Sequence, residues 1–271
     1  MKRIIGILTA TLCAAVAFFY SCQPLEPDSY TRTFYRVATV KYKLGTAYLS
    51  LDCTNESYRL KNFKDTLDMQ RFGVSAGDKI IALLKIEASG SIDNNVMTLE
   101  ECSKIAIDEL ATSHPSDTLN FYYQMTQFSL GEIIYPDIWN EGHVVTVAPI
   151  YYVTSTESKA EFQLYPLDFR NDTLFLRLYS DIPDADVSYR PYLQSLLCYD
   201  ISSIRKPASN PVDQEIRDSI VARLDSLQPA SFYVHIVSPD SLRANNSKNP
   251  AGKYNLPYPI PPSTTTIPFD F

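Results

Sequence analysis

The side chains that could carry catalysis are few in this 271-residue chain. Residues 73–77, GVSAG, satisfy the G-x-S-x-G pattern of a hydrolase nucleophile, which requires a strand before the serine and a helix after it. Here LDMQRF precedes the motif, and DKIIALLKIE, which has the character of a strand, follows it. This order is typical of a turn that leads into a strand. We therefore predict no catalytic residue, and a hydrolase is the disfavoured alternative.

Metal and cofactor chemistry also lacks a suitable set of residues. The three histidines, His114, His143 and His235, lie far apart and have no acid at an informative spacing. Glu141 and His143 could share one face of a strand, but a zinc site needs more clustered ligands. The chain has eight glycines and no GxGxxG or GxxxxGK sequence, which are the usual phosphate-binding loops. We expect no metal and no cofactor.

The N-terminus predicts export and a lipid anchor. MKR precedes an uncharged apolar run over residues 4–19, which is shorter than a membrane span and typical of a signal peptide over residues 1–21. Ser21-Cys22 resembles a lipobox, in which signal peptidase II cuts before a diacylglyceryl cysteine, although Phe19 and Tyr20 differ from its usual upstream residues. Cys22 is therefore the predicted anchor of an outer-membrane lipoprotein of the cell envelope, on either face of that membrane. An ordinary signal peptide or a tethered helix is the alternative.

Three cysteines follow the anchor, and an odd number leaves at least one thiol free. Cys53 and Cys102 are the candidates for a disulfide, and the alternative is that all three are small apolar side chains. The net charge of −7 and the lack of a basic run would repel phosphate backbones. We expect no nucleic-acid partner.

The rest of the chain alternates short β-branched and aromatic runs with turn sequences, which predicts an all-β fold. After a tether over residues 22–32, five runs in residues 33–112 favour a small OB-like β-barrel. A polar stretch then predicts a boundary, and the runs in residues 120–240 predict a β-sandwich-type domain. Residues 241–271 are expected to form an extended, proline-rich tail.

One amphipathic helix is predicted at about residues 211–227, inserted in the second domain. Asn210 can cap its free N–H groups, and Pro211 suits the first helical position. Arg217 and Arg223 are expected to face water, because an apolar stripe at three- and four-residue steps would pack against a sheet. The stripe consists of Val212, Ile216, Ile220, Leu224 and Leu227.

The tail carries a second regular pattern. Ile267, Phe269 and Phe271 alternate as in a strand, while Pro268 excludes a central strand and allows an edge. Such a segment could add a strand to a neighbouring sheet edge, which would make the protein a structural or assembly subunit.

The chain resembles the NigD-like lipoproteins of Gram-negative anaerobes. The resemblance rests on the signal segment, on FYRVATVKYKLGTAYLSLDC with VSAGDKIIALLKIE, and on DIWNEGHVVTVAPIYY with NDTLFLRLYSD. It covers residues 22 to about 240 and implies an N-terminal OB-type barrel followed by a C-terminal β-sandwich. The family implies no catalytic residues.

Asp-Ser/Thr-aliphatic triplets resemble the O-glycosylation acceptor sites of exported proteins in such bacteria. The alternative is that they form turns and helix caps, since aspartate followed by serine or threonine also bonds local backbone. The candidate acceptors are Thr66, Thr118, Thr173, Ser226 and Ser241.

Binding is the function that the sequence favours. Trp139, Tyr151 and Tyr152 are the candidate ligand contacts, because flat rings stack on sugars or on other proteins. The alternative is that these rings fill the core. We expect a non-catalytic, lipid-anchored binding or interaction module whose partner is a glycan or another envelope protein.

Overall fold

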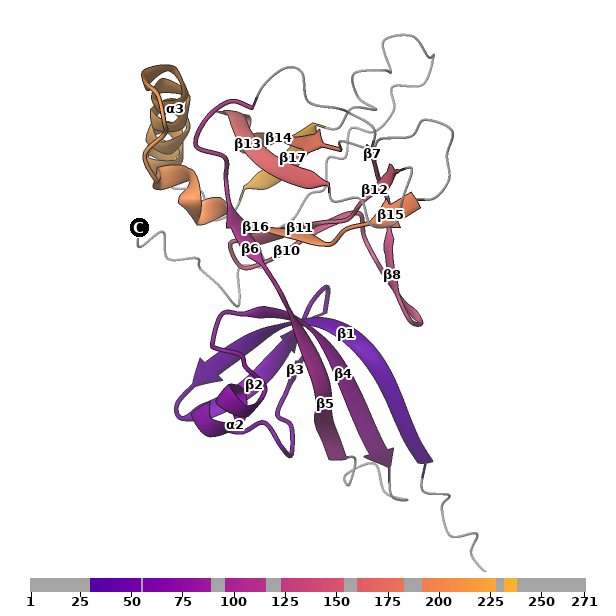
Figure 1. The fold of residues 1–271 in the computed structure, drawn as a ribbon. Helices are drawn as coiled ribbons and strands as arrows, with labels where there is room; N and C mark the ends of the chain where they lie inside the picture. The colour runs from indigo at the N-terminus through magenta and orange to yellow at the C-terminus, as the bar shows by residue number, and fades with distance from the viewer. Residues whose placement is uncertain are drawn as a thin grey trace, which may run out of the picture.

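The computed structural model describes residues 30–54, 56–88, 96–115, 123–153, 160–182, 192–227 and 232–237. These residues form two β-structured units, one above the other in Figure 1. The signal peptide, Cys22, Thr118, Ser241 and the tail over residues 241–271 lie outside the described residues.

The first unit is a five-stranded antiparallel sheet in the order β3-β2-β1-β4-β5. Helix α2 (Thr66–Arg71) lies between β3 and β4, where Asp65 caps it by accepting bonds from the backbone N–H groups of Leu67 and Asp68. The strands are β1 (Tyr30–Lys43), β2 (Thr46–Leu51), β3 (Ser57–Tyr58), β4 (Lys79–Ala88) and β5 (Val96–Ile105).

The segment after β3 closes this sheet on itself. The Lys61 N–H donates to the Met97 carbonyl over 2.9 Å, and the Asn62 side chain both donates to and accepts from the Leu99 backbone at 2.7 and 2.9 Å. Because these bonds join the β3 side of the sheet to β5, the five strands and α2 form an OB-like barrel, as the sequence predicts. Its core contains Ala38, Val40, Leu49, Phe63, Ile80 and Leu84, all fully buried.

The second unit contains four small sheets. Their strand orders are β10-β11-β16-β6, β15-β12-β7, β13-β14-β17 and β8-β9. The strands are β6 (Ile107–Glu109), β7 (Tyr123–Met125), β8 (Phe128–Leu130), β9 (Ile133–Tyr135), β10 (Ile138–Glu141), β11 (Val144–Val147), β12 (Pro149–Tyr152), β13 (Glu161–Arg170), β14 (Thr173–Asp181), β15 (Tyr192–Gln194), β16 (Leu197–Asp200) and β17 (Tyr233–Val237).

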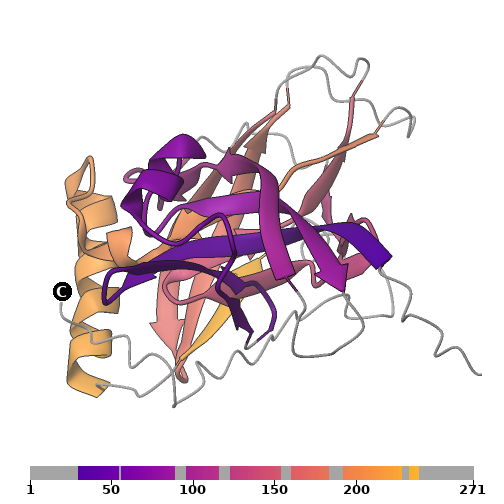
Figure 2. The ribbon, with the colours of Figure 1, turned by 90° about the horizontal axis from the view of Figure 1, so that it is seen from below.

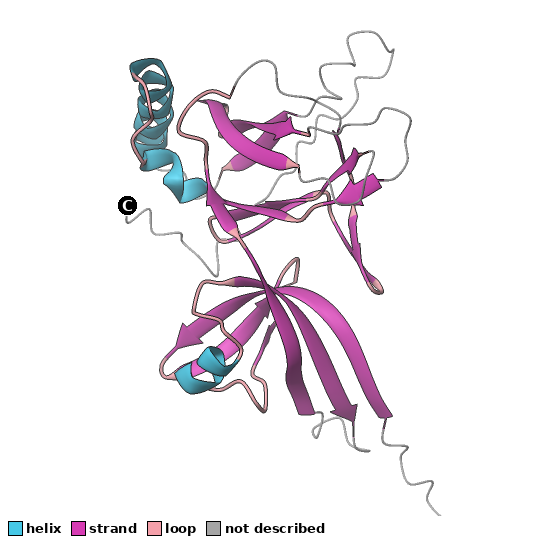
Figure 3. Cartoon of the chain, viewed as in Figure 1, coloured by secondary structure: helices cyan, strands magenta, loops and turns pink. Residues whose placement is uncertain are grey.

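These sheets pack as a sandwich around one apolar core. Strand β14 supplies Leu174, Leu176 and Leu178, which are fully buried against side chains such as Val145 and Val147 of β11. Figure 3 shows strands through both units, with the longer helix at one side of the second. The all-β fold, with a barrel followed by a sandwich-type domain, is therefore confirmed.

The two units share one continuous connection. Strand β5 ends at Ile105 and β6 begins at Ile107, where it pairs in parallel with β16 of the second unit. The chain thus crosses between the units at Ala106, earlier than the polar stretch 111–120 that the sequence suggests. The tether also ends early, because β1 begins at Tyr30.

Helix α3 (Pro211–Leu227) has the predicted bounds but a different buried face. Its buried residues are Asp213, Arg217, Ile220 and Leu224, whereas Val212 is 68% exposed and Leu227 is 54% exposed. The expectation that Arg217 faces water is wrong. The physical reason is that Asp213 and Arg217 form hydrogen bonds with groups on neighbouring segments, such as the Tyr165 hydroxyl and the Leu110 carbonyl. The helix face that packs against the sandwich therefore includes these two charged side chains in place of Val212 and Leu227. Figure 2 shows α3 along one side of the molecule.

Candidate ligand-binding cleft and domain interface

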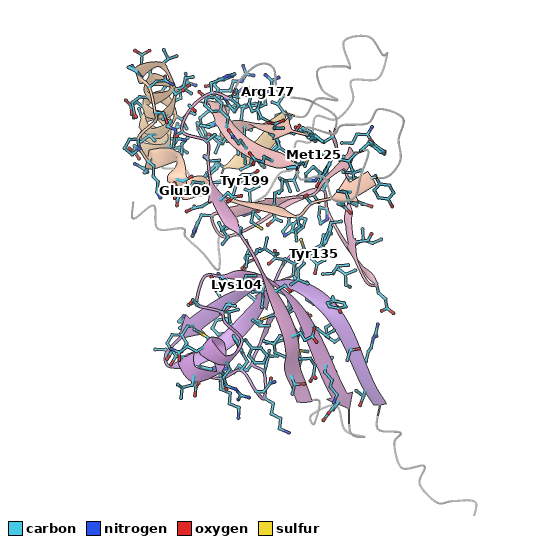
Figure 4. All side chains as sticks on the ribbon, viewed as in Figure 1. Lys104, Glu109, Met125, Tyr135, Arg177 and Tyr199 are labelled. Atoms are coloured by element: carbon cyan, nitrogen blue, oxygen red, sulfur yellow. The ribbon has the colours of Figure 1, made fainter. Side chains whose placement is uncertain are left out.

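The predicted contact residue Trp139 lies in the interface between the two units. Its side chain is 1% exposed and stacks on Tyr135 with ring centroids 5.2 Å apart. Tyr135, which Figure 4 labels at the junction, accepts a 2.9 Å hydrogen bond from the Val37 N–H of β1. Trp139 cannot stack on a ligand here, so the prediction of an exposed ring is wrong. Its apolar body is drawn into an interface core that includes Val37 and Ala148.

A buried ion pair lies beside Trp139. Lys79 of β4 and Asp52 after β2 are 1% and 0% exposed, and Nζ lies 2.6 Å from Oδ2. The indole Nε1–H of Trp139 donates to the same Oδ2 over 2.7 Å, while Lys79 also donates to Thr39 over 3.1 Å. Asp52 Oδ1 has no hydrogen-bond partner among the described residues. The network therefore joins barrel and sandwich through one carboxylate oxygen.

The other two predicted contact residues differ in exposure. Tyr151 is 6% exposed and belongs to the sandwich core, so it is not available for a ligand. Tyr152 is half-buried, and its ring lies 6.5 Å from that of Tyr192, which is 62% exposed. Tyr152 therefore stays a predicted contact.

A second polar network fixes helix α3. Arg217, 1% exposed, donates to the carbonyls of Ser203, Ile204 and Lys206 at the end of the 3-10 helix η2 (Ile201–Arg205). It also donates to Leu110 and Ala111, at 3.1 and 2.6 Å. Burial lowers the pKa of its guanidinium. Arg217 thus replaces water for five carbonyls, and its role is structural.

Asp213 anchors the first turn of the same helix. Burial alone would raise the pKa of this carboxyl, but hydrogen bonds lower it: the Tyr165 hydroxyl donates over 2.6 Å and the His114 backbone N–H over 3.0 Å. Asn210 also donates to Asp213 and caps the helix by accepting from the Asp213 N–H at 3.0 Å. His114 itself bonds Tyr179 at 2.8 Å, so this histidine belongs to a packing network.

The three cysteines that could form a disulfide or react chemically do not pair with one another. Cys53, Cys102 and Cys198 are all free, so the predicted Cys53–Cys102 disulfide is wrong. Cys53 follows β2 at the interface, whereas Cys102 lies on β5 and contacts the Phe72 carbonyl after α2. Burial raises the pKa of the Cys198 thiol to about 11.

Glu141 and His143 do not act together. Glu141 accepts a 3.0 Å bond from the Ser50 hydroxyl of the barrel, whereas His143 lies 3.8 Å from Asp200. The described ranges hold no group of three or more potential metal ligands. The GVSAG motif forms the turn between α2 and β4, where the Ser75 N–H donates to Asp78 over 2.7 Å.

At the described candidate sites for O-glycosylation, a side chain of each Asp-Ser/Thr triplet forms a hydrogen bond with nearby backbone. Asp65 before Thr66 is the cap of α2, Thr173 closes the β13–β14 turn by donating to Asn171, and Ser226 donates to Arg223 within α3. Turn and cap chemistry therefore accounts for these triplets, and modification stays a prediction.

A cleft of about 470 Å³ opens between the barrel and the β8–β9 hairpin. On one side, Arg36 lies over the Phe34 ring at 4.6 Å, and the Tyr58 hydroxyl donates to Glu56 over 2.7 Å. At the hairpin, Arg32 pairs with Glu132. The full lining is Arg32, Thr33, Phe34, Tyr35, Arg36, Leu51, Glu56, Tyr58, Ile86, Met97, Leu130, Gly131, Glu132 and Ile133.

One wall of this cleft is an open strand edge. Strand β1 pairs with β4 from Tyr30 to Thr39, but it pairs with β2 only from Ala38 onward. Residues 30–37 of β1 therefore have a strand neighbour on one side only among the described residues. Sequence reasoning missed this edge, because each run was recognised without its pairing.

The hydrogen bonds of Val37 show which backbone groups face the cleft. The Val37 N–H donates to Tyr135, and its carbonyl accepts from the Asp52 N–H over 3.0 Å, so both groups point away from β4. Because these directions alternate along a strand, the N–H and carbonyl groups of Thr33 and Tyr35 also point away from β4. The Tyr35 carbonyl accepts a bond from the Arg36 side chain. The edge thus presents the N–H groups of Thr33 and Tyr35 and the Thr33 carbonyl at the spacing of a β ladder, while Arg36 already engages the Tyr35 carbonyl.

Fold and cleft together define a two-unit, all-β protein with an open strand edge between an OB-like barrel and a β-sandwich. No protein-family model and no curated protein matches the chain. None of the described helices is long and apolar enough to cross a membrane.

Several solved structures resemble the chain at low identity. One is a NigD-like immunity protein from Bacteroides caccae, 11% identical, with 76% of this chain and 86% of that chain covered and a TM-score of 0.42. Another is a predicted lipoprotein from Bacteroides fragilis, 14% identical, with coverage of 76% and 88% and a TM-score of 0.44. The NigD-like family that the sequence resembles is thus represented among the structural neighbours.

Proposed function

We propose that this chain is a non-catalytic, lipid-anchored protein of the cell envelope that binds an extended polypeptide segment of an envelope partner. The single observation that carries the proposal is the open edge of β1 at Thr33 and Tyr35 within a cleft of about 470 Å³. The predicted signal peptide and Cys22 support the location and the anchor.

A polypeptide strand suits this edge because its own N–H and carbonyl groups match those of β1. Main-chain bonds supply affinity in such strand addition, and pockets for alternate side chains supply specificity. Here Leu130 and Ile133 of the hairpin, and Tyr58 and Met97 of the barrel, offer apolar surface on the two sides of the cleft. The ligand predicted on this basis is an extended segment with apolar side chains.

A glycan is the second candidate. Tyr35 is 44% exposed, and Arg36 and Glu56 place charged groups beside it, which is a combination that sugar rings and hydroxyls can use. Burial of Trp139 removes the flat surface on which the sequence-based glycan hypothesis rested. The two candidates therefore share one site and differ in ligand chemistry.

Site-specific photo-cross-linking tests the site. A photoreactive phenylalanine analogue replaces Tyr35 in one strain and Tyr42 in another; both lie in β1, at 44% and 42% exposure, but only Tyr35 lines the cleft. We expect irradiation of intact cells to give a discrete protein adduct at position 35 and none at position 42. Equal adducts at both positions, or none at position 35, would refute the polypeptide proposal. Binding to a glycan array that is lost in Tyr35→Ala would favour the second candidate.

The anchor and its side of the membrane need separate measurements. Mass spectrometry of the N-terminal peptide should show a diacylglyceryl modification on Cys22, and an unmodified cysteine would refute the lipid anchor. Proteinase K treatment of whole cells then distinguishes the two faces. Cleavage favours a partner at the cell surface, and protection until the outer membrane is opened favours a periplasmic partner.

A further inference from the structure

We infer that a groove in the sandwich binds alkylammonium groups, those of a linear polyamine or of lysine side chains. The groove has a volume of about 660 Å³ and lies between the start of β13 on one side and β6 with the loop after it on the other. The two sides meet where the Ala111 N–H donates to the Leu164 carbonyl over 2.8 Å. The groove shares no lining residue with the β1 cleft, so the inference goes beyond the proposed function.

The lining of the groove is acidic. It contains Asp108, Glu109 and Glu161 but no lysine, arginine or histidine. Lys206, which lies outside the lining, pairs with Glu109. Asp108 and Glu161 are exposed and form no ion pair within the part of the chain that the structure describes. Carboxylates on the two sides of the groove, one on β6 and one on β13, are therefore available to a cationic ligand.

A further carboxylate lies beside Glu161. The register of β13 and β14 places Asp181 directly opposite Glu161, and both residues are exposed. Like charges in directly opposed positions destabilise a strand pair. A bound cation at this end of the groove would relieve that repulsion.

A buried hydroxyl in the groove points to a specific ligand. Tyr199 of β16 is 1% exposed, and its hydroxyl has no hydrogen-bond partner among the described residues. Tyr199 is the register partner of Asp108 in the parallel β16–β6 pair, so the two side chains lie on one face of the sheet, and both line the groove. Figure 4 labels Tyr199 and the neighbouring Glu109 on these two strands.

The hydroxyl of Tyr199 is neutral and can accept a hydrogen bond from a cation. Burial, together with the nearby Asp108 carboxylate, raises the pKa of this hydroxyl. An ammonium group has three N–H donors. One such group can therefore donate to the Asp108 carboxylate and to the Tyr199 oxygen at the same time.

An organic ammonium suits the groove better than a metal ion. The described ranges hold no group of three or more potential metal ligands, so the carboxylates do not converge on one point. A ligand with two ammonium groups can instead reach Asp108 with one and Glu161 with the other. Phe162 and Leu197 are partly buried and supply apolar surface in the lining, against which the methylenes of such a ligand can pack.

Isothermal titration calorimetry of the mature chain with spermidine at low ionic strength tests the site. We expect saturable binding that is weakened about fivefold in Asp108→Asn and about fivefold in Tyr199→Phe. The matched control is Glu100→Gln, an exposed acid on β5 of the barrel, which should change the affinity by less than about twofold. Absence of binding at millimolar spermidine, or equal weakening in Glu100→Gln, would overturn the inference.

The stability of Tyr199→Phe separates ligand binding from a structural role. The hydroxyl has no described partner in the free protein, so its removal should leave the urea midpoint unchanged or raise it. A variant that is less stable than wild type but binds spermidine with unchanged affinity would show that the hydroxyl is structural, which overturns the inference.

Tetralysine distinguishes the two sources of the ammonium group. Tighter binding of tetralysine than of spermidine, weakened in Asp108→Asn, would assign the groove to lysine side chains of a protein partner. The reverse order of affinities would assign it to a small polyamine. Displacement of spermidine by an equal concentration of Ca²⁺ would overturn the inference, because it would show a general attraction of cations to an acidic surface.

Discussion

Replacement of Lys79 by methionine should destabilise the protein strongly, because it leaves the Asp52 carboxylate buried without its cation. Asp52 is 0% exposed, and Lys79 Nζ lies 2.6 Å from its Oδ2. After the change, the Trp139 indole is the one side-chain donor to that carboxylate that remains among the described residues. Removal of one partner of a buried ion pair typically costs about 3–5 kcal/mol. We expect the free energy of unfolding to fall by this amount.

The pair as a whole should contribute much less than this. Asp52 Oδ1 has no partner among the residues that the structure describes, so the carboxylate is incompletely compensated for its loss of water. Asp52→Asn removes the charge and retains a carbonyl oxygen that can accept the indole N–H. The double variant Asp52→Asn/Lys79→Met should therefore recover most of the loss, to within about 1–2 kcal/mol of wild type.

Equilibrium unfolding in urea measures these free energies, and fluorescence reports on the site directly because Trp139 is the single tryptophan of the chain. The control is Lys85→Met on the same strand, where Lys85 pairs with Glu87 at 2.6 Å but the side chains are 31% and 50% exposed. Such an exposed pair should contribute at most about 1 kcal/mol. A loss below about 1 kcal/mol in Lys79→Met, or additive losses in the double variant, would refute the reasoning.

Three further predictions concern other buried or reactive groups. Arg217→Met should lower the free energy of unfolding by about 3 kcal/mol or more, since five backbone carbonyls lose their donor. The control Arg223→Met removes a half-exposed guanidinium and should lower the free energy of unfolding by about 1 kcal/mol or less in the same urea assay. Hydrogen bonds lower the pKa of Asp213 from its ordinary value of 3.8, so its contribution to the free energy of unfolding is complete above that pH and is lost as the pH falls through the lower folded-state value. Unfolding in urea between pH 3 and 7 should therefore show a smaller loss of stability at acid pH in Asp213→Asn than in the wild type. An identical pH profile in the two proteins would contradict this. In the native protein, a maleimide should label Cys53 slowly, because burial and the Asp52 carboxylate raise the pKa of this exposed thiol to about 12, and it should label the buried Cys198 only after unfolding. Peptide mass spectrometry checks both, and native labelling of Cys198 as fast as after unfolding would contradict its burial.

Local sequence patterns predicted the elements of the fold well. The alternating runs in residues 33–112 correspond to the barrel strands, and KIIALLKIE forms β4 despite its helix-like periodicity. Helix α3 begins at Pro211 and ends at Leu227 as expected, because capping and propensity act within a few residues. Short elements such as α2 and β6 were missed, since their signals are weak over three to six residues.

The candidate site could not be predicted in the same way. Trp139 is buried because Asp52, 87 residues earlier, accepts its N–H, and Arg217 is buried because it reaches the carbonyls of Leu110 and Ala111, more than 100 residues away. The open edge of β1 exists because β2 pairs only with its second half. The sequence by itself determined the type and order of the elements, because propensity and periodicity are local. Only the tertiary structure decided which polar groups are buried and which strand edge stays open, because each depends on partners far away in the chain.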